Sequence, residues 1–140
     1  MTTITGWRVT SGEAEGAVLK LDEPVSFWGG IGSEGDIIDV HHPQHGAIVT
    51  GRILVMRSGR GSSSGTYVLA ELLRLGIAPA GIILTEPDGI IATGALVAAE
   101  LYDARMPIVT VSDEDYARIE DGVTMSIAMD GDAALITINP

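Results

Sequence analysis

The chain has 140 residues, 46% of them hydrophobic, and it contains no cysteine. This composition predicts one domain, residues 1–140, with a substantial core, and it excludes a disulfide framework, a thiolate nucleophile or an iron–sulfur cluster held by this chain. The net charge of −11 argues against a nucleic acid or an anionic membrane as partner. Since no leader and no run of membrane-spanning length is evident, we expect a cytoplasmic protein.

The first part of the chain is expected to form short strands joined by turns. Residues 7–10 and 17–21 are predicted to be paired strands. The segment 24–30 then places the only Phe and one Trp beside two glycines. Two interpretations stay open for this segment: a core anchor at a turn, or a ligand or subunit surface that Trp28, Gly29 and Gly30 would line.

All histidines of the chain lie in residues 39–46, which makes this segment a candidate metal site. Neighbouring histidines in one loop cannot easily face a single ion, and their spacing matches no zinc pattern. Pro43 and Gly46 instead indicate a turn that carries solvated histidines. The sequence therefore predicts no metal site here.

Alternating strands and helices are predicted for the rest of the chain. The expected elements are a long buried strand at 47–56, a helix at 66–75 ending at Gly76, a strand at 80–85, a turn at 86–89, a helix at 93–101, a strand at 107–111, a helical turn through 119 capped by Asp113, and a hairpin of 123–129 and 133–138. This order indicates an α/β domain with three layers, sheet, sheet and helix, and parallel central strands. Ligands of such sheets bind at the carboxyl ends of the strands.

A glycine- and serine-rich segment, residues 59–65 (Gly-Arg-Gly-Ser-Ser-Ser-Gly), lies between the predicted strand and helix. The glycines permit a tight turn, and the serines fall where the first amides of a helix lack intrahelical partners. Such a helix end attracts anions, and Arg60 adds positive charge. The segment is therefore the main candidate site.

The residues alone leave two interpretations of this segment open. The first is anion binding or simple helix capping. The second is general base catalysis by one serine, with its alkoxide stabilised by loop amides and by Arg60. A nucleotide-binding loop is excluded because no Lys follows Gly65.

Three segments together, residues 24–30, residues 59–65 and Ala78-Pro79-Ala80, resemble the small subunit or swivel domain of the aconitase X family. The resemblance covers nearly the whole chain. It implies a swivelling β/β/α domain similar to that of aconitase. It also implies a hydro-lyase whose iron–sulfur cluster resides in a large subunit, which agrees with the absence of cysteine here.

The resemblance also implies roles for individual residues. In aconitases the first serine of a Gly-Ser-Ser-Arg loop is the base, and that serine corresponds to Ser62. Ser62 would take a proton from carbon while iron in the partner holds the departing hydroxyl. Gly61, Ser63 and Ser64 would bind substrate. Aconitases have a substrate-binding arginine where this chain has Ser64, and Arg60 is the candidate replacement for that arginine. Asp39 and His42 also match the family pattern, and either line the subunit cleft or form a structural turn.

The family divides by substrate. Bacterial members resemble cis-3-hydroxy-L-proline dehydratase, which gives pyrroline-2-carboxylate, and archaeal members resemble phosphomevalonate dehydratase. The triplet Ser62-Ser63-Ser64 is more similar to the bacterial branch, which makes hydroxyproline the favoured substrate. A non-catalytic anion-binding or swivelling carrier module is a second hypothesis. A phosphohistidine carrier would need a histidine at a helix start, and none of the three histidines is expected there.

Overall fold

The computed structural model describes residues 1–139, and within them seven strands form one closed barrel. The order around the barrel is β1-β5-β4-β3-β2-β6-β7. The strands are β1 Thr2–Thr10, β2 Ala14–Lys20, β3 Ile53–Val55, β4 Gly81–Leu84, β5 Ile108–Thr110, β6 Thr124–Asp130 and β7 Ala133–Asn139. Strands β2, β3, β4 and β5 pair in parallel, and the other pairs are antiparallel.

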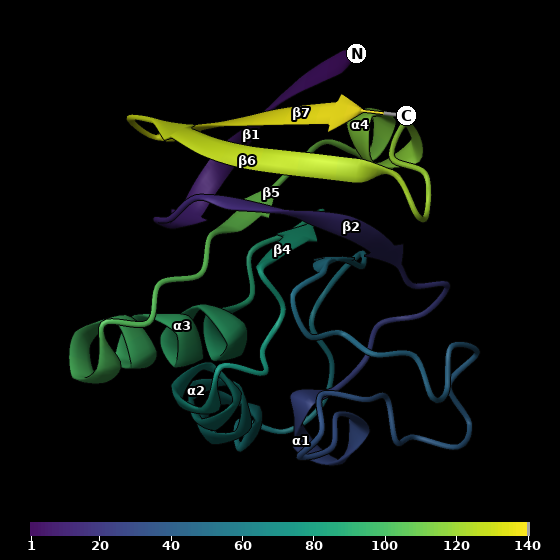
Figure 1. Cartoon of the computed structure of the whole chain (residues 1–140), viewed down its shortest axis with the longest axis vertical. Helices are drawn as coiled ribbons and strands as arrows, with labels where there is room; N and C mark the ends of the chain where they lie inside the picture. The colour runs from purple at the N-terminus through teal and green to yellow at the C-terminus, as the bar shows by residue number, and fades with distance from the viewer. Residues whose placement is uncertain (140) are drawn as a thin grey trace.

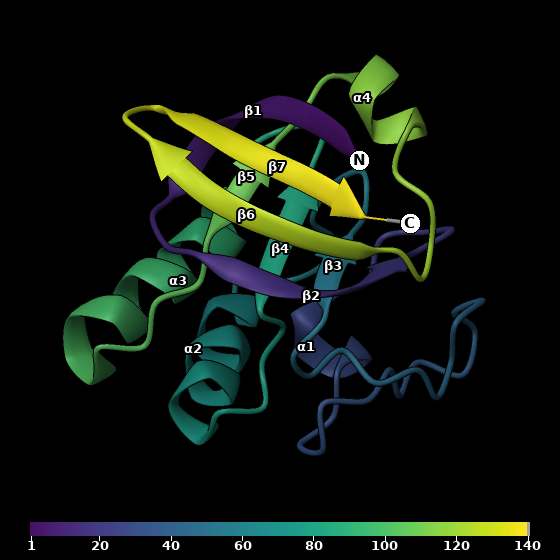
Figure 2. The same cartoon turned by 45° about the horizontal axis from the view of Figure 1, so that its top comes forward.

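Three of the four helices cover one side of the barrel. Helices α1 Phe27–Gly30, α2 Gly65–Leu75 and α3 Gly89–Tyr102 lie together below the parallel strands (Figure 1). The short helix α4 Asp113–Ala117 follows β5 and lies near the start of β1 and the end of β7, apart from the other three helices (Figure 2). None of the helices in residues 1–139 is both long and apolar enough to cross a membrane.

Side-chain alternation in the parallel strands explains two separate apolar cores. In β3, Leu54 faces the helices, while Ile53 and Val55 face the barrel interior, because successive side chains of a strand point to opposite faces. Every strand contributes to the interior core, from Ile4 in β1 to Ile136 in β7. Parallel strands buried on both faces are expected to be uniformly apolar, as β3 and β4 are.

The structure confirms an α/β fold with parallel central strands, and it does not confirm the three-layer description. Strand β1 pairs with both β5 and β7, and β2 pairs with both β3 and β6. The parallel and antiparallel sections are therefore joined along both sides into one barrel. The predicted hairpin at the end of the chain is confirmed, with Gly131 at φ 62° in its turn.

Several element boundaries differ from the prediction. Strands β1 and β2 begin earlier than predicted, and they do not pair with each other as predicted, because each pairs with two other strands of the barrel. Residues 47–52 do not extend β3, because Gly46 and Gly51 adopt φ of 89° and 71° and turn the chain. Helix α3 begins at Gly89 because the Asp88 carboxylate accepts a hydrogen bond from the amide of Ile91 at 2.9 Å. Helix α4 is capped by Ser112 and not by Asp113.

Candidate functional site

Residues 57–64, called the serine loop below, connect β3 to α2 at the carboxyl end of the parallel strands. They include all but the last residue of the predicted glycine- and serine-rich segment 59–65. The first residue of the serine loop is fixed by β4: the Arg57 carbonyl accepts hydrogen bonds from the Thr85 amide at 2.9 Å and the Thr85 hydroxyl at 2.8 Å. The loop therefore lies where open α/β sheets bind ligands, as the sequence predicted.

The three serines of the loop differ in exposure and in hydrogen bonding. Ser62 and Ser63 are exposed and Ser64 is partly buried. The Ser62 hydroxyl accepts a hydrogen bond from the Ser64 amide at 3.1 Å, and the Ser62 carbonyl accepts one from Gly65 at 2.9 Å. The Ser64 side chain makes no capping bond to α2. Ser62 alone thus presents a hydroxyl that is oriented by an amide and open to solvent.

An amide that donates to the Ser62 oxygen favours the deprotonated form of that hydroxyl over the neutral form. The positive end of the α2 dipole acts in the same direction within the first turn. Both effects arise from backbone groups that are already in place, and so they require no rearrangement when charge develops on the oxygen. The local structure is therefore suited to stabilising a serine alkoxide.

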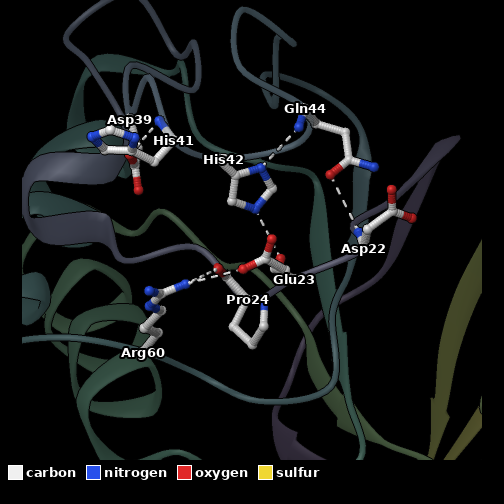
Figure 3. Close-up of polar contacts among 8 residues, drawn as sticks. All are labelled: Asp22, Glu23, Pro24, Asp39, His41, His42, Gln44 and Arg60. Atoms are coloured by element: carbon white, nitrogen blue, oxygen red, sulfur yellow. Dashed lines mark hydrogen bonds and ion pairs between the residues drawn. The ribbon is translucent and has the colours of Figure 1, made fainter.

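The two arginines of the segment point to different partners. Arg60 forms an ion pair with Glu23 at 3.8 Å and donates to the Pro24 carbonyl at 3.4 Å (Figure 3). Both contacts are long, and the Arg60 side chain is 55% exposed, so a bound anion can compete for its guanidinium. Arg57 instead contacts Asp113 and lies over the Tyr116 ring.

Two glycines of the loop pass directly over oxygen-bearing side chains from other elements. Gly61, at φ 96°, lies against Ser26, and Gly59 lies against the Asp88 carboxylate. Neither neighbour was predicted from the sequence. Asp88 stood in a predicted turn, where an Asp before a helical segment is a recognisable capping signal, and Ser26 carried no signal that connected it to the loop.

The histidine segment, residues 39–46, lies beside Glu23, the partner of Arg60, and is not part of the serine loop. His42 is 5% exposed, its Nδ1 accepts from the Gln44 amide at 3.0 Å, and its Nε2 lies 2.8 Å from the Glu23 carbonyl (Figure 3). Because Nδ1 accepts a hydrogen bond, Nε2 carries the proton and donates to the Glu23 carbonyl. Asp39 accepts from the His41 amide at 2.9 Å. His42 therefore connects residues 39–45 to the segment that holds Arg60.

The other predicted surface residues lie around α1. Trp28 is 57% exposed, and Gly29 adopts φ 81° with open space where a Cβ would lie. Gly30 is buried, and a Cβ there would lie 3.0 Å from a Val25 methyl. Within residues 1–139 no three His, Cys, Asp or Glu side chains are grouped so that they could hold a metal ion.

A cavity of about 430 Å³ lies beside the start of the loop. Its lining includes Lys20, Arg57 and Tyr116, with the two cations each 4.7 Å from the centre of the Tyr116 ring. Burial raises the pKa of Tyr116, and burial followed by repulsion from Arg57 lowers the pKa of Lys20. The loop serines do not line this cavity.

Comparison with known proteins identifies the family. The model of the aconitase X swivel domain matches residues 3–138. The chain belongs to the aconitase X swivel-domain family. An aconitase X structure from Thermococcus kodakaraensis (holo-form) superposes on this swivel domain with a TM-score of 0.83 and 31% identity, over 98% of this chain and 99% of that one.

Relatives of this aconitase X swivel domain are named for two dehydratases. A cis-3-hydroxy-L-proline dehydratase of Pseudomonas aeruginosa is 41% identical over 81% of this chain. A phosphomevalonate dehydratase small subunit of Methanothermobacter thermautotrophicus is 36% identical over 91% of it. The chain spans about a fifth (21%) of the Pseudomonas protein and 93% of the Methanothermobacter subunit.

The residues of this swivel domain do not fit an iron–sulfur cluster. Such clusters are held by cysteine thiolates, sometimes with histidine, and the chain has no cysteine. Of its histidines, His42 has both ring nitrogens occupied by the hydrogen bonds that fix its loop. What this chain offers a reaction is therefore the serine loop and its surroundings.

Proposed function

We propose that this chain is the base-carrying half of a hydro-lyase site that is completed by an aconitase X large subunit. The observation that carries the proposal is the exposed Ser62 hydroxyl, held at 3.1 Å from the Ser64 amide at the start of α2. The family assignment supports it, because relatives of this chain are named dehydratases. Ser62 would remove the proton from the substrate carbon next to its carboxylate.

In this proposal the neighbours of Ser62 have separate roles. The Ser64 amide and the end of α2 stabilise the Ser62 alkoxide, and Gly61 allows the backbone to approach the substrate closely. Ser63 and Ser64 supply further polar groups to the substrate. Arg60 exchanges its long contacts with Glu23 and Pro24 for the substrate anion, because a guanidinium matches a carboxylate or phosphate with two parallel hydrogen bonds.

A second chain is needed because the loop is open to water. A serine alkoxide is a useful base only where water is excluded, and Ser62 and Ser63 are exposed on this chain. The proposed large subunit would cover the loop, contact Trp28, and carry the iron–sulfur cluster expected for the family. Departure of the hydroxyl group would take place on the partner's side of the site.

The proposed substrate is cis-3-hydroxy-L-proline, converted to pyrroline-2-carboxylate. The serine triplet and the 41% identity to the Pseudomonas enzyme favour it. Phosphomevalonate is the second candidate, favoured by the match to 93% of the Methanothermobacter small subunit. Both substrates carry a carboxylate, and phosphomevalonate also carries a phosphate, and these are groups that Arg60 and a helix N-terminus bind. A non-catalytic anion-binding module is the remaining alternative.

Substitution Ser62→Ala in the assembled enzyme tests the proposed base. We expect turnover to fall by at least about 100-fold, the usual contribution of a positioned general base, with assembly unchanged. Ser11→Ala is the matched control, because Ser11 is also exposed and lies outside the loop. Initial rates and gel filtration of both variants with the large subunit provide the measurement. A Ser62→Ala enzyme that keeps its rate would refute the assignment.

A further inference from the structure

The serine loop is confined on one side by Asp88. A Cβ on Gly59 would overlap the Asp88 carboxylate, lying 2.5 Å from Cγ, so the Gly59 backbone is in direct contact with that group. The carboxylate cannot move away freely, because Asp88 Oδ1 accepts the Ile91 amide at 2.9 Å as the cap of α3. Helix α3 therefore holds a rigid surface against the loop.

Ser26 confines the other side of the loop. A Cβ on Gly61 would lie 2.7 Å from the Ser26 Cβ and would overlap its hydroxyl. That hydroxyl is also fixed: it accepts from the Trp28 amide at 3.1 Å and donates to the Trp28 carbonyl at 3.0 Å. Ser26 is the cap of α1, just as Asp88 is the cap of α3.

We infer that Ser26 and Asp88 are positioning residues, which hold the backbone of Gly59 and Gly61 between two helix caps and thereby fix the location of Ser62. This inference rests on the proposed function. Ser62 itself is exposed and its side chain makes one hydrogen bond, to the Ser64 amide within the loop. Between the hydrogen-bonded Arg57 carbonyl and Ser62, the contacts of Gly59 with Asp88 and of Gly61 with Ser26 hold the loop backbone against the rest of the fold.

The catalytic consequence is precision of placement. A displacement of about 1 Å at a reacting group can lower a rate by about 100-fold. Such a displacement need not weaken substrate binding, because the long and exposed Arg60 side chain can adjust to a backbone shift of this size, whereas the short Ser62 side chain cannot. Loss of the Asp88 contact should therefore lower kcat more than it changes KM.

Asp88→Ser separates the two roles of Asp88. Serine is as good a helix cap as aspartate, but its side chain is too short to fill the space beside Gly59. We expect Asp88→Ser in the assembled enzyme to keep its thermal stability and its KM, while kcat falls at least about 10-fold. Asp88→Asn has the same shape and the same capping oxygen, and it should keep both stability and kcat. If Asp88→Ser keeps the wild-type kcat, Asp88 serves only as a helix cap, and the inference is overturned.

A second measurement does not depend on turnover. In the chain without its partner, amide hydrogen exchange of residues 59–64 should be faster in Asp88→Ser than in the wild type, with exchange in the barrel strands unchanged. Unchanged exchange in the loop would overturn the inference whatever the kinetics. If no substrate is turned over by the wild-type complex, the proposed function fails, and the exchange measurement still decides whether Asp88 holds the loop.

Discussion

At the scale of single residues, Tyr116 is the centre of the most unusual environment outside the serine loop. Lys20 and Arg57 each lie 4.7 Å from the centre of its ring, and Lys20 Nζ also donates to the carbonyls of Tyr116 at 3.1 Å and Ile119 at 2.7 Å. A cation over an aromatic face stabilises a fold by roughly 0.5–1 kcal/mol at an exposed site. This cluster connects α4 to the residue from which the serine loop departs.

The raised pKa of Tyr116 predicts a specific loss of stability in alkali. Burial disfavours the phenolate in the fold, so the folded chain holds this proton to higher pH than the unfolded chain. The protonated Tyr116 contributes to the free energy of unfolding below the ordinary tyrosine pKa of 10.0. This contribution declines as the pH rises through the pKa of Tyr116 in the folded chain. We expect Tyr116→Phe to lack this decline.

Urea unfolding of the wild type and of Tyr116→Phe, measured from pH 8 to pH 11, checks this prediction. The lowered pKa of Lys20 makes the free energy of unfolding rise with pH over the same range. Lys20 is present in both proteins, so this effect cancels in the difference between them. The difference between the two unfolding free energies should shift in favour of the variant above about pH 10. Parallel curves over the whole range would contradict the assigned environment.

Residue types and spacing revealed the serine loop but not the side chains that confine it. Glycines beside a run of serines, between an apolar strand and an amphipathic helix, predict a helix-start site, and the structure places Ser62 there. Ser26 and Asp88 reach the loop through tertiary packing of α1 and α3. No local pattern encodes such a contact, because each residue is explained locally as a helix cap.

At the scale of elements, α2 and α3 pack closely because of a glycine. A Cβ on Gly94 would lie 2.9 Å from the Thr66 carbonyl and 3.2 Å from the Leu69 Cβ. Thr66 also donates its hydroxyl to the Ile90 carbonyl at 2.9 Å, which connects the same two helices. The helix that begins with the serine loop is therefore aligned by α3.

Gly94→Ala should destabilise the fold although alanine is the better helix former. The added methyl meets a backbone carbonyl, and overpacking of this kind costs about 1–3 kcal/mol, which exceeds the gain of about 1 kcal/mol in helix propensity. Gly89→Ala, in the first turn of the same helix with nothing within 4 Å of its added Cβ, is the control and should be neutral or slightly stabilising. Urea unfolding distinguishes them, and equal stabilities would refute the close packing.

Helix periodicity and turn residues predicted most elements correctly. The apolar stripe and Gly76 placed α2 within one residue of its observed bounds, and Gly76 adopts φ 74° at its end. The apolar content of residues 47–52 predicted a longer β3, but the backbone of residues 47–49 instead forms hydrogen bonds with residues 35–37, around an isolated bridge between Asp36 and Ile48. Apolar composition alone does not distinguish a buried strand from a buried irregular segment.

At the scale of the whole molecule, closure of the barrel could not be predicted from the sequence. It depends on the pairing of β1 with β7 and of β2 with β6, which are contacts between the two ends of the chain. Hydrophobic alternation is the same in an open layered sheet and in a closed barrel, because both bury one face of each strand. Helices α1, α2 and α3, with the serine loop before α2, lie together on one side of the closed barrel.

That arrangement concentrates the proposed chemistry on a single exposed side, which a partner can cover. In the proposed function the chain contributes Ser62, Arg60 and the start of α2, and it lacks the cysteines that an iron–sulfur cluster requires. The central claim is that this chain holds one half of a dehydratase site and that neither half is active alone.

Anaerobic dehydration assays with this chain, with the aconitase X large subunit of the same organism, and with both together test that claim most directly. Each sample would be given cis-3-hydroxy-L-proline and phosphomevalonate in turn. We predict turnover of cis-3-hydroxy-L-proline only when both chains are present. Turnover by the large subunit alone, or no turnover of either substrate by a complex that assembles, would contradict the claim.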